Sequence, residues 1–407
     1  MRFHVRSRFV PVLVAGVWLL ASVPASPPVQ AQTPTAAALF DDTVLHDIRL
    51  LINTRDLRQL RDRYLESFTV PADLVWRNTR IRNVGLRTRG AGSRNPSKLG
   101  LELTFDRYTT GQTFLGLSGL VLDNLWQDPS LFREHLSMAV FNRMGQTVPR
   151  ESFARVYINN ELQGVYGVTE PVDMRFATTA TKEASGRLFE YRWVYPYFAG
   201  DLGDNLASYQ QLFASRTTST DTVSMLYGPI RDLFRAANDF ESPDWRSRLD
   251  AAIDLPQLLT HIAIQGCVSN IDGFMGYAGL NNFYLYRFAG TNRHRLFAWD
   301  EDFAFQFVDT SIVRHGDEPV AFVDRALGEP DLRSVFLDAA ASCAHAIGDD
   351  EWLLAEINRL VSLVGPAIYA DPRKQFSNAA FDAEVEFLRS FAAARPAAVL
   401  AEVASLR

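Results

Sequence analysis

The alternation of hydrophobic and polar residues predicts β-strands through much of the first half of the chain. The clearest run places every second apolar residue on one strand face, through Leu99, Leu101, Leu103 and Phe105. Lys98 falls on the opposite, polar face. With two earlier runs this strand forms a predicted meander, and a hairpin follows it; the strands are 73–76, 81–89, 98–105, 153–158 and 163–169.

In the second half, apolar residues recur three and four positions apart, which is the spacing of one face of an α-helix. The predicted helices are 221–238, 256–268, 331–347, 351–364 and 381–406. A β-hairpin interrupts them, because NNFYLYRFA and RLFAWD read as short strands around the turn-prone segment 290–293. The pattern therefore predicts an α+β protein, with strands mostly first and helices mostly after them.

Carboxylates mark both ends of that embedded hairpin. Asp272 precedes it, Asn281 and Asn282 open its first strand, and Asp300 ends its second, with Asp302 two residues later. Antiparallel neighbours lie about 5 Å apart, so the fold-back should bring these groups together. Carboxylate and amide oxygens suit a divalent metal such as Mg²⁺. Alternatives stay open: Asp272 and Asp302 could cap turns, and the D-x-D triplet 300–302 could hold a metal-bound nucleotide-sugar diphosphate.

A cationic corner lies at one end of the meander. Arg87 and Arg89 share a strand face, Lys98 follows, and the Gly-rich segment 90–96 joins the two strands. Backbone N–H groups of such a turn, with nearby Lys and Arg, can cradle phosphates. A solvated basic hairpin is the alternative, since exposed Lys and Arg are common.

Composition and charge narrow the classes of function. The chain has 407 residues, 47% of them hydrophobic, so it can bury a large core. A net charge of −6 gives no support for nucleic-acid binding. Cys267 and Cys343 do not make a disulfide scaffold; we expect two buried core residues, with one disulfide as the alternative.

Residues 1–31 have the pattern of a secretory signal peptide. Arginines precede an apolar run over 9–21 that is too short to span a bilayer, and small residues near Ala31 suit cleavage. No later run reaches transmembrane length, so we expect a secreted or periplasmic protein without a membrane anchor after cleavage. The oligomeric state cannot be inferred from these features.

Several segments together resemble the spore-coat CotH kinase family. They are RTRGAGSRNPSKLGLELTF, DNLWQDPSLFREHLSMAVFNRMG, VYINNELQGVYGVTEPVD, NIDGFMGYAGLNNFYLYRF and FAWDEDFAF. The resemblance runs from about residue 40 to the C-terminal FDAEVEFLRSFAAARPAAVL. It implies an atypical protein-kinase-like, two-lobed domain over 32–407, with a β-rich N-terminal lobe at about 40–190 and a mostly helical C-terminal lobe at about 191–407.

The resemblance also implies roles for individual residues in phosphate transfer from ATP, with Mg²⁺ or Mn²⁺, to Ser or Thr of a protein substrate. Asp272 matches the catalytic aspartate. Nucleotide contacts fall to Lys98, with Arg89 in its corner, and to Glu170 at the connection between lobes. Metal contacts fall to Asp300, Asn282 and Asp302. The HRD, DFG and G-x-G-x-x-G motifs of ordinary protein kinases are missing. A catalytically silent envelope or coat-like structural protein is an alternative, favoured by the expected export because ATP is scarce outside the cytoplasm.

Overall fold

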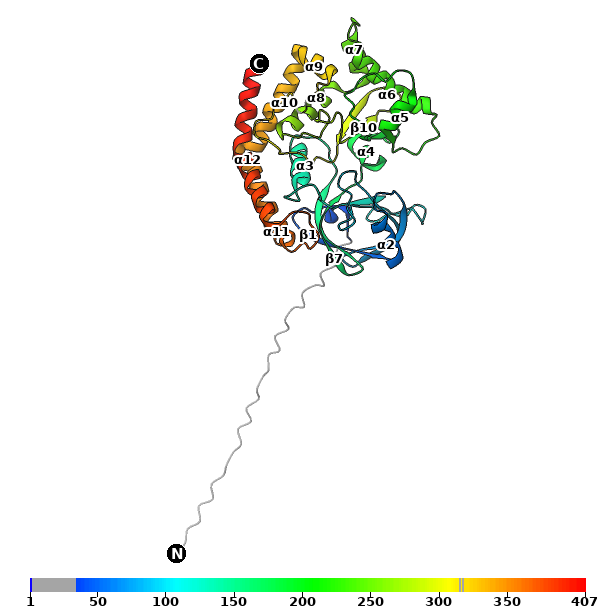
Figure 1. Ribbon diagram of the computed structural model, residues 1–407, viewed down its shortest axis with the longest axis vertical. Helices are drawn as coiled ribbons and strands as arrows, with labels where there is room; N and C mark the ends of the chain where they lie inside the picture. Colours follow the sequence, from blue (N-terminus) through cyan, green and yellow to red (C-terminus); the bar gives the residue numbers. More distant parts are fainter. Residues whose placement is uncertain (2–33, 315, 317) are drawn as a thin grey trace. The chain divides into compact units, whose positions relative to one another are not determined.

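A computed structural model describes Met1 and residues 34–314, 316 and 318–407 of the chain. Within it, Pro34–Arg407 forms one compact unit (Figure 1). Apart from Met1, the predicted signal peptide lies outside the described residues. Among the described residues, no helix combines the length and the apolar character needed to cross a membrane.

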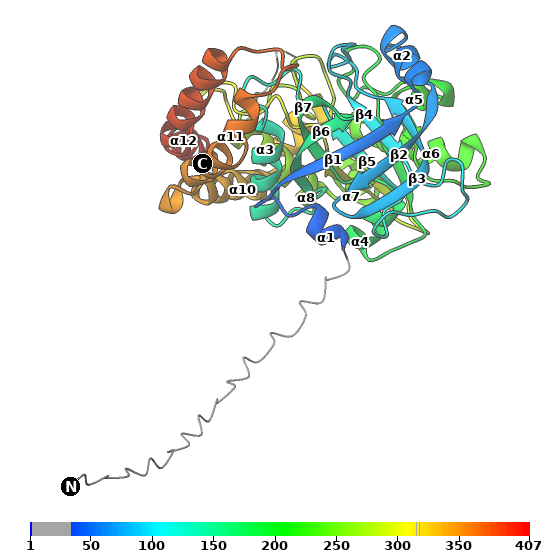
Figure 2. The same cartoon turned by 90° about the horizontal axis from the view of Figure 1, so that it is seen from below.

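Seven strands of the first half close into a barrel. In order around the barrel they are β1 (Leu45–Ile52), β2 (Thr69–Trp76), β3 (Thr79–Thr88), β4 (Leu101–Thr104), β5 (Gly119–Asp123), β7 (Glu161–Thr169) and β6 (Glu151–Ile158). The barrel closes because β1 pairs in parallel with β6, whereas its other pairs are antiparallel (Figure 2). The predicted meander and hairpin are present. The alternation of hydrophobic and polar residues did not predict that their strands would close into a barrel.

Short helices accompany the barrel. They are α1 (Ala36–Leu39), α2 (Thr54–Asp62) and α3 (Arg133–Arg143), the last between β5 and β6. The side chain of Asn53 caps α2 by accepting the N–H of Arg55. Just before α3, the carboxylate of Asp128 accepts the N–H groups of Ser130 and of Arg133, the first residue of the helix.

A second, four-stranded sheet lies outside the barrel. Its order is β11 (His294–Ala298), β10 (Phe283–Arg287), β8 (Arg187–Tyr191) and β9 (Phe213–Ser215), with all pairs antiparallel. The predicted hairpin forms β10 and β11, in a register that sets Phe283 opposite Ala298. This register places Asn282 and Asp300 at the same end of the hairpin.

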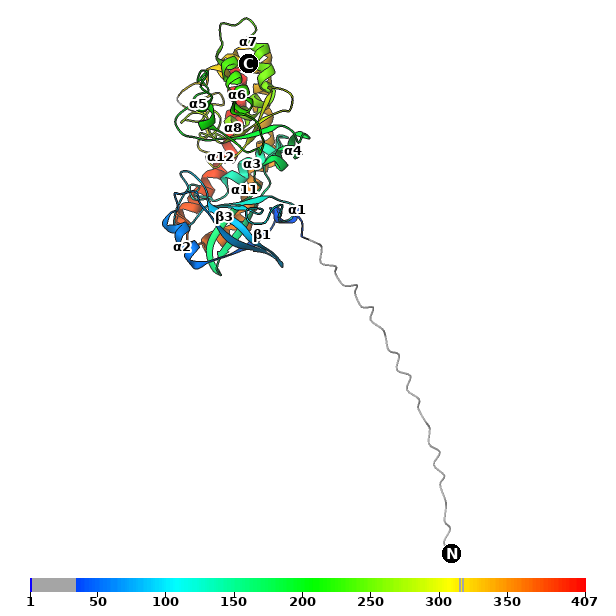
Figure 3. The same ribbon diagram turned by 90° about the vertical axis from the view of Figure 1, so that its right-hand side faces the viewer.

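Helices make up most of the remaining chain. They are α4 (Met174–Thr181), α5 (Leu206–Leu212), α6 (Val223–Asn238), α7 (Trp245–Ala252), α8 (Leu255–Cys267), α9 (Ala321–Gly328), α10 (Pro330–Gly348), the short 3₁₀ turn Asp349–Glu351, α11 (Trp352–Tyr369) and α12 (Asn378–Leu406). Figure 3 shows α5 to α8 gathered away from β1 and β3. The five predicted helices all form, with ends shifted by a few residues, and the α+β class is confirmed.

A buried ion pair ties the barrel to the C-terminal helices. Lys98 donates to Asp371, in the loop between α11 and α12, across 2.8 Å. Asp371 also accepts the N–H groups of Val165 and Arg373. Gly164 has φ +123°, and a Cβ there would lie 2.3 Å from the Asp371 carboxylate, so glycine lets this loop approach β7. Helix α12 then runs along the unit to the C-terminus (Figure 1).

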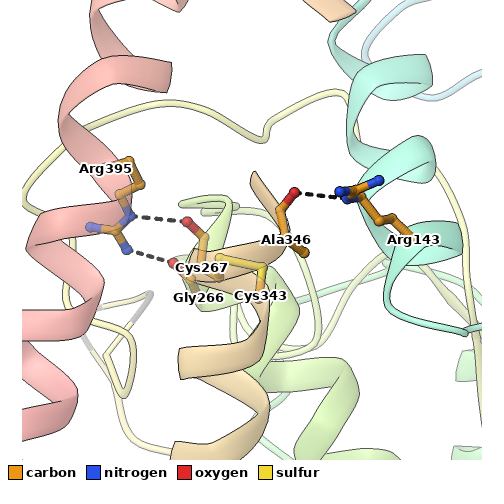
Figure 4. The surroundings of a disulfide bond; sticks show 6 residues. All are labelled: Arg143, Gly266, Cys267, Cys343, Ala346 and Arg395. Atoms are coloured by element: carbon orange, nitrogen blue, oxygen red, sulfur yellow. Dashed lines mark hydrogen bonds between the residues drawn. A yellow bond between two sulfur atoms is a disulfide. The ribbon is translucent and has the colours of Figure 1, made fainter. Parts of the chain in front are cut away.

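A disulfide joins Cys267, at the end of α8, to Cys343 in α10 (Figure 4). Their Cα atoms lie 6.3 Å apart, so the expectation of two unpaired core cysteines is wrong and the alternative holds. Beside them Arg395 of α12, only 1% exposed, donates to the carbonyl oxygens of Gly266 and Cys267 at 2.6 and 3.0 Å. The C-terminal carbonyls of α8, which have no partner within the helix, are thereby satisfied.

Candidate functional site

Asp272 lies in the loop that follows the C-terminal end of α8, where the disulfide and Arg395 are located. Its N–H donates to the side-chain oxygen of Asn270 at 2.7 Å. Its carboxylate accepts the side-chain amides of Asn281 and Asn282, both at 3.1 Å. Asn282 donates to the Asp272 carbonyl as well, so its amide oxygen is the atom left for a metal.

Asp300 and Asp302 follow β11 at the same end of the hairpin. Asn282 and Asp300 have left-handed backbones, with φ of 58° and 57°. This region costs free energy for residues other than glycine, although Asn and Asp tolerate it best, and such residues cluster at functional sites. The structure thus joins the two ends of the hairpin as predicted.

The carboxylates of this group shift one another's pKa. Burial, and next the charge of Asp300, raise the pKa of Asp272 to about 6. Burial also raises the pKa of Asp300 to about 6, although Arg89 opposes the shift. The pKa of Asp302 is raised well above its ordinary value by burial and by the charge of Asp300. Carboxylates that repel one another in this way favour a bound cation.

Arg89 brings positive charge to these acids. It forms an ion pair with Asp123 at the end of β5, and its guanidinium lies 5.4 Å from the ring centroid of Trp299. Burial opposes its charge, yet the carboxylates of Asp123, Asp300 and Glu134 hold its pKa above the ordinary value. Of the cationic corner predicted from sequence, Arg89 therefore faces the predicted acids, whereas Arg87 pairs with Glu102.

Two further acids belong to this group, and Asp123 was not picked out from the sequence. Asp123 ends β5, and Glu134 is buried in the first turn of α3. Burial and the charges of Glu151, Asp300 and Asp123 raise the pKa of Glu134 well above its ordinary value. The one signal for Asp123 was a carboxylate at the end of an apolar run, in the pattern that made Asp300 a candidate.

Glu301, the middle residue of the D-x-D triplet, is fully buried and points to other partners. Its carboxylate accepts the side-chain amides of Gln265 and Asn270. Burial raises its pKa to about 8, and these two donors oppose the rise. Within the triplet, the Glu301 side chain is therefore engaged by Gln265 and Asn270, whereas Asp300 and Asp302 belong to the acid group near Asp272.

Lys98 and Glu170, the other predicted nucleotide contacts, have partners within the chain. Lys98 was expected on a polar strand face, but it is only 1% exposed and bound to Asp371. Burial lowers its pKa, and Asp371 opposes the drop. Glu170 pairs with Arg150 at 2.5 Å and lines a cavity of about 570 Å³ beside α4.

A further acid and histidine group lies elsewhere, between α3 and α11. One ligand atom from each of Asp42, His135 and Glu356 lies within 4.8 Å of the others. Arg359 already bridges the two acids, at 2.8 Å from Asp42 and 2.5 Å from Glu356. Its guanidinium supplies the positive charge that a metal would bring, so this group is an ion-pair network.

The fold and the site together define a class of protein. It is an α+β protein that combines a β-barrel, a helical part and a group of buried acids with raised pKa values. A family model described as CotH kinase protein matches residues 86–399, and the chain belongs to this family. It is 24% identical over 352 residues to inner spore coat protein H of Bacillus subtilis (strain 168), covering 84% of this chain and 92% of that protein.

A solved structure, the proinflammatory kinase CtkA of Helicobacter pylori, is also similar. The match covers 75% of this chain and 93% of that one, with 10% identity and a TM-score of 0.32. A kinase-like fold was expected from the sequence, and membership of the CotH kinase protein family agrees with it.

Proposed function

We propose that this protein is a metal-dependent kinase that transfers phosphate from ATP to Ser or Thr of a protein substrate. The observation that carries the proposal is the meeting of Asp272, Asp300 and Asp302, whose pKa values are all raised by burial and, for Asp272 and Asp302, also by the charge of Asp300. Phosphate transfer needs mainly positioning, neutralisation of charge and a carboxylate beside the acceptor hydroxyl.

Asp300, Asp302 and the amide oxygen of Asn282 would hold Mg²⁺ or Mn²⁺. The donor set fits, because hard divalent cations prefer carboxylate and amide oxygens and the acids repel one another without a cation. A bound metal would neutralise phosphate charge during transfer.

Asp272 would orient the acceptor hydroxyl and accept its proton. Asn281 and Asn282 fix the carboxylate from one side through hydrogen bonds of 3.1 Å. A pKa of about 6 keeps the group mostly ionised at neutral pH, while leaving it basic enough to take a proton.

Arg89 is the cation that we assign to the nucleotide phosphates, since it already faces the acids. Lys98 would first have to exchange Asp371 for a phosphate, so its direct contact with ATP is the weaker part of the proposal. Glu170 follows β7 and stays our choice for the connection near the nucleotide. The signal-peptide pattern supports export to a secreted or periplasmic location.

The alternative of a silent structural protein is favoured by one finding. The relative from Bacillus subtilis is named as a spore coat protein, and ATP is expected to be scarce outside the cytoplasm. A silent protein would keep the fold and lose nucleotide binding or turnover.

Two measurements on the mature chain test the proposal. Thermal shift with Mg²⁺ or Mn²⁺ compares ATP, GTP and a UDP-sugar, and transfer of radiolabel from the γ-phosphate to protein is measured alongside. We expect ATP with metal to raise Tm and label to appear on Ser or Thr. A shift with the UDP-sugar alone would favour the D-x-D transferase, and no shift with any nucleotide would favour the structural protein.

A further inference from the structure

A closed ring of hydrogen bonds surrounds the turn that carries Asp272. Glu301 accepts Gln265 Nε2 at 2.8 Å with one carboxylate oxygen and Asn270 Nδ2 with the other. Asn270 Oδ1 accepts the N–H of Asp272 at 2.7 Å, and Gln265 Oε1 accepts the N–H of Phe274 at 2.9 Å. Glu301, Gln265 and Asn270 are each 0% exposed.

Gly273, between the two backbone donors, shows how tightly the ring encloses the turn. A Cβ at this position would lie 2.3 Å from Gln265 Nε2. Any side chain there would push Gln265 away, so only glycine lets the amide pass under the turn.

The direction of every hydrogen bond in the ring follows from its backbone donors. The N–H groups of Asp272 and Phe274 can only donate, so they fix the oxygen atoms of Asn270 and Gln265 toward themselves. The amide nitrogens must then point at Glu301 and donate. Each oxygen of Glu301 therefore faces an amide donor, and an amide of the same shape at position 301 would set one donor against another.

We propose that Glu301 is a positioning residue that holds the Asp272 turn in place relative to Asp300 and Asp302, through Asn270 and Gln265. The chain continuity of 300–302 links the ring to the proposed metal ligands on both sides. This inference rests on the proposed kinase function. Burying a carboxylate is costly unless its hydrogen bonds are satisfied, and the ring satisfies it while fixing the turn.

The test exchanges donors and acceptors without changing shape. Glu301→Gln places an amide nitrogen against that of Asn270 or Gln265, and Asn270→Asp alone places one carboxylate against another. The double variant Glu301→Gln/Asn270→Asp restores complementarity, because the amide introduced at position 301 can donate to the new carboxylate and accept from Gln265. Glu241→Gln, at an exposed carboxylate, controls for the loss of charge.

Hydrogen exchange of the Asp272 and Phe274 amides reports on the ring without relying on activity. We expect exchange to quicken at least tenfold in each single variant and to return to within about threefold of the parent in the double variant. In the transfer assay kcat should fall at least tenfold in Glu301→Gln with KM for ATP within twofold, and the double variant should recover it.

Each outcome decides the proposal. Unchanged exchange in Glu301→Gln, or a double variant no better than the single ones, would overturn it. If Glu301→Gln does not fold, a folded double variant supports the ring, and failure of both overturns it. If the parent transfers no phosphate, the kinase function fails while hydrogen exchange still tests the ring. Altered exchange with unchanged kcat would remove the positioning role.

Discussion

Lys98 and Asp371 form a buried ion pair in which each charge has a partner. Asp272, Asp300 and Asp302 are instead buried acids with raised pKa values, and the charge of Asp300 adds to the rise at Asp272 and Asp302. Asp371 also accepts two backbone N–H groups, so its lone pairs are satisfied by the chain itself. The acids at the hairpin have Arg89 facing them, yet its ion pair is with Asp123.

The difference separates charges that are paired within the chain from acids that repel one another. A buried pair with all its hydrogen bonds holds two parts of the fold together, and breaking it leaves an uncompensated charge. Repelling acids do the reverse, because they cost folding free energy unless a cation joins them. Such groups are found at sites where a ligand supplies the missing charge.

The largest contrast between the two regions should appear in phosphate transfer by variants of the acids. Asp272→Asn should bind ATP and metal normally but transfer phosphate about 10³-fold more slowly, since it loses the proton acceptor. Asp300→Asn should lose both metal-dependent ATP binding and transfer. Calorimetric titration of ATP with Mg²⁺, run beside the radiolabel assay, measures the two effects.

Folding stability provides the control for that pair. Both variants remove a repelling charge, so neither should unfold more easily than the parent. Equal loss of ATP binding in the two variants, or full transfer by Asp272→Asn, would contradict the assigned roles. A marked drop in Tm would make the acids structural, as Lys98 is.

The ion pair should give the largest stability effect. Lys98→Met leaves the Asp371 carboxylate buried without its cation, and we expect the free energy of unfolding to fall by about 3 kcal/mol or more. Denaturant unfolding measures the change. Lys182→Met, at an exposed lysine, is the matched control and should change stability by no more than about 0.5 kcal/mol. A Lys98→Met protein as stable as the control, but with weaker ATP binding, would restore Lys98 as a phosphate ligand.

The same two regions show how far the sequence could lead. Local periodicity predicted the strands and helices because each depends on neighbouring residues. The partner of Lys98 could not be predicted, because Asp371 lies 273 residues further along the chain and nothing in the strand pattern refers to it. Alternation placed Lys98 on the strand face opposite the apolar one. The loop between α11 and α12, which carries Asp371, covers Lys98 there.

At the acid site, the proximity of Asp272 and Asp300 could be predicted because one hairpin links them. The turn and the two strands predicted that Asp272 and Asp300 would meet, since pairing of adjacent strands is a local event. Asp123 and Glu134 reach the site from β5 and α3, so only the tertiary fold brings them in. The D-x-D pattern leaves its middle residue unspecified. It therefore did not predict the hydrogen bonds that Glu301 accepts from Gln265 and Asn270.

A divalent cation should stabilise the acid site and leave the ion pair untouched. At a Mg²⁺ concentration ten times the dissociation constant, the expected gain in unfolding free energy is about 1.4 kcal/mol. Thermal unfolding with and without Mg²⁺ measures it. Asp300→Asn should lose the gain and Lys98→Met should keep it. A gain retained by Asp300→Asn would place the metal away from Asp300.

The smallest expected effect is the pH dependence of that metal stabilisation. Asp272 and Asp300 have folded pKa values of about 6, above the unfolded value near 4, so the folded state binds more protons between these values. Without metal, their contribution to stability therefore falls as pH rises through this window. Buried His261 and His294, with pKa lowered to about 3 and about 4, act oppositely and lose stability as pH falls below about 6.5.

Comparing samples with and without Mg²⁺ at each pH cancels the histidine contribution, because both samples contain it. Protons compete with the metal for the acids, so the gain in Tm from Mg²⁺ should be larger at pH 8 than at pH 5. The difference in unfolding free energy should be about 1 kcal/mol, since one unit of pKa corresponds to about 1.4 kcal/mol. In Asp300→Asn the dependence should flatten. An equal gain at both pH values would mean that the metal binds groups other than these acids, and the contrast with the ion pair would then fail.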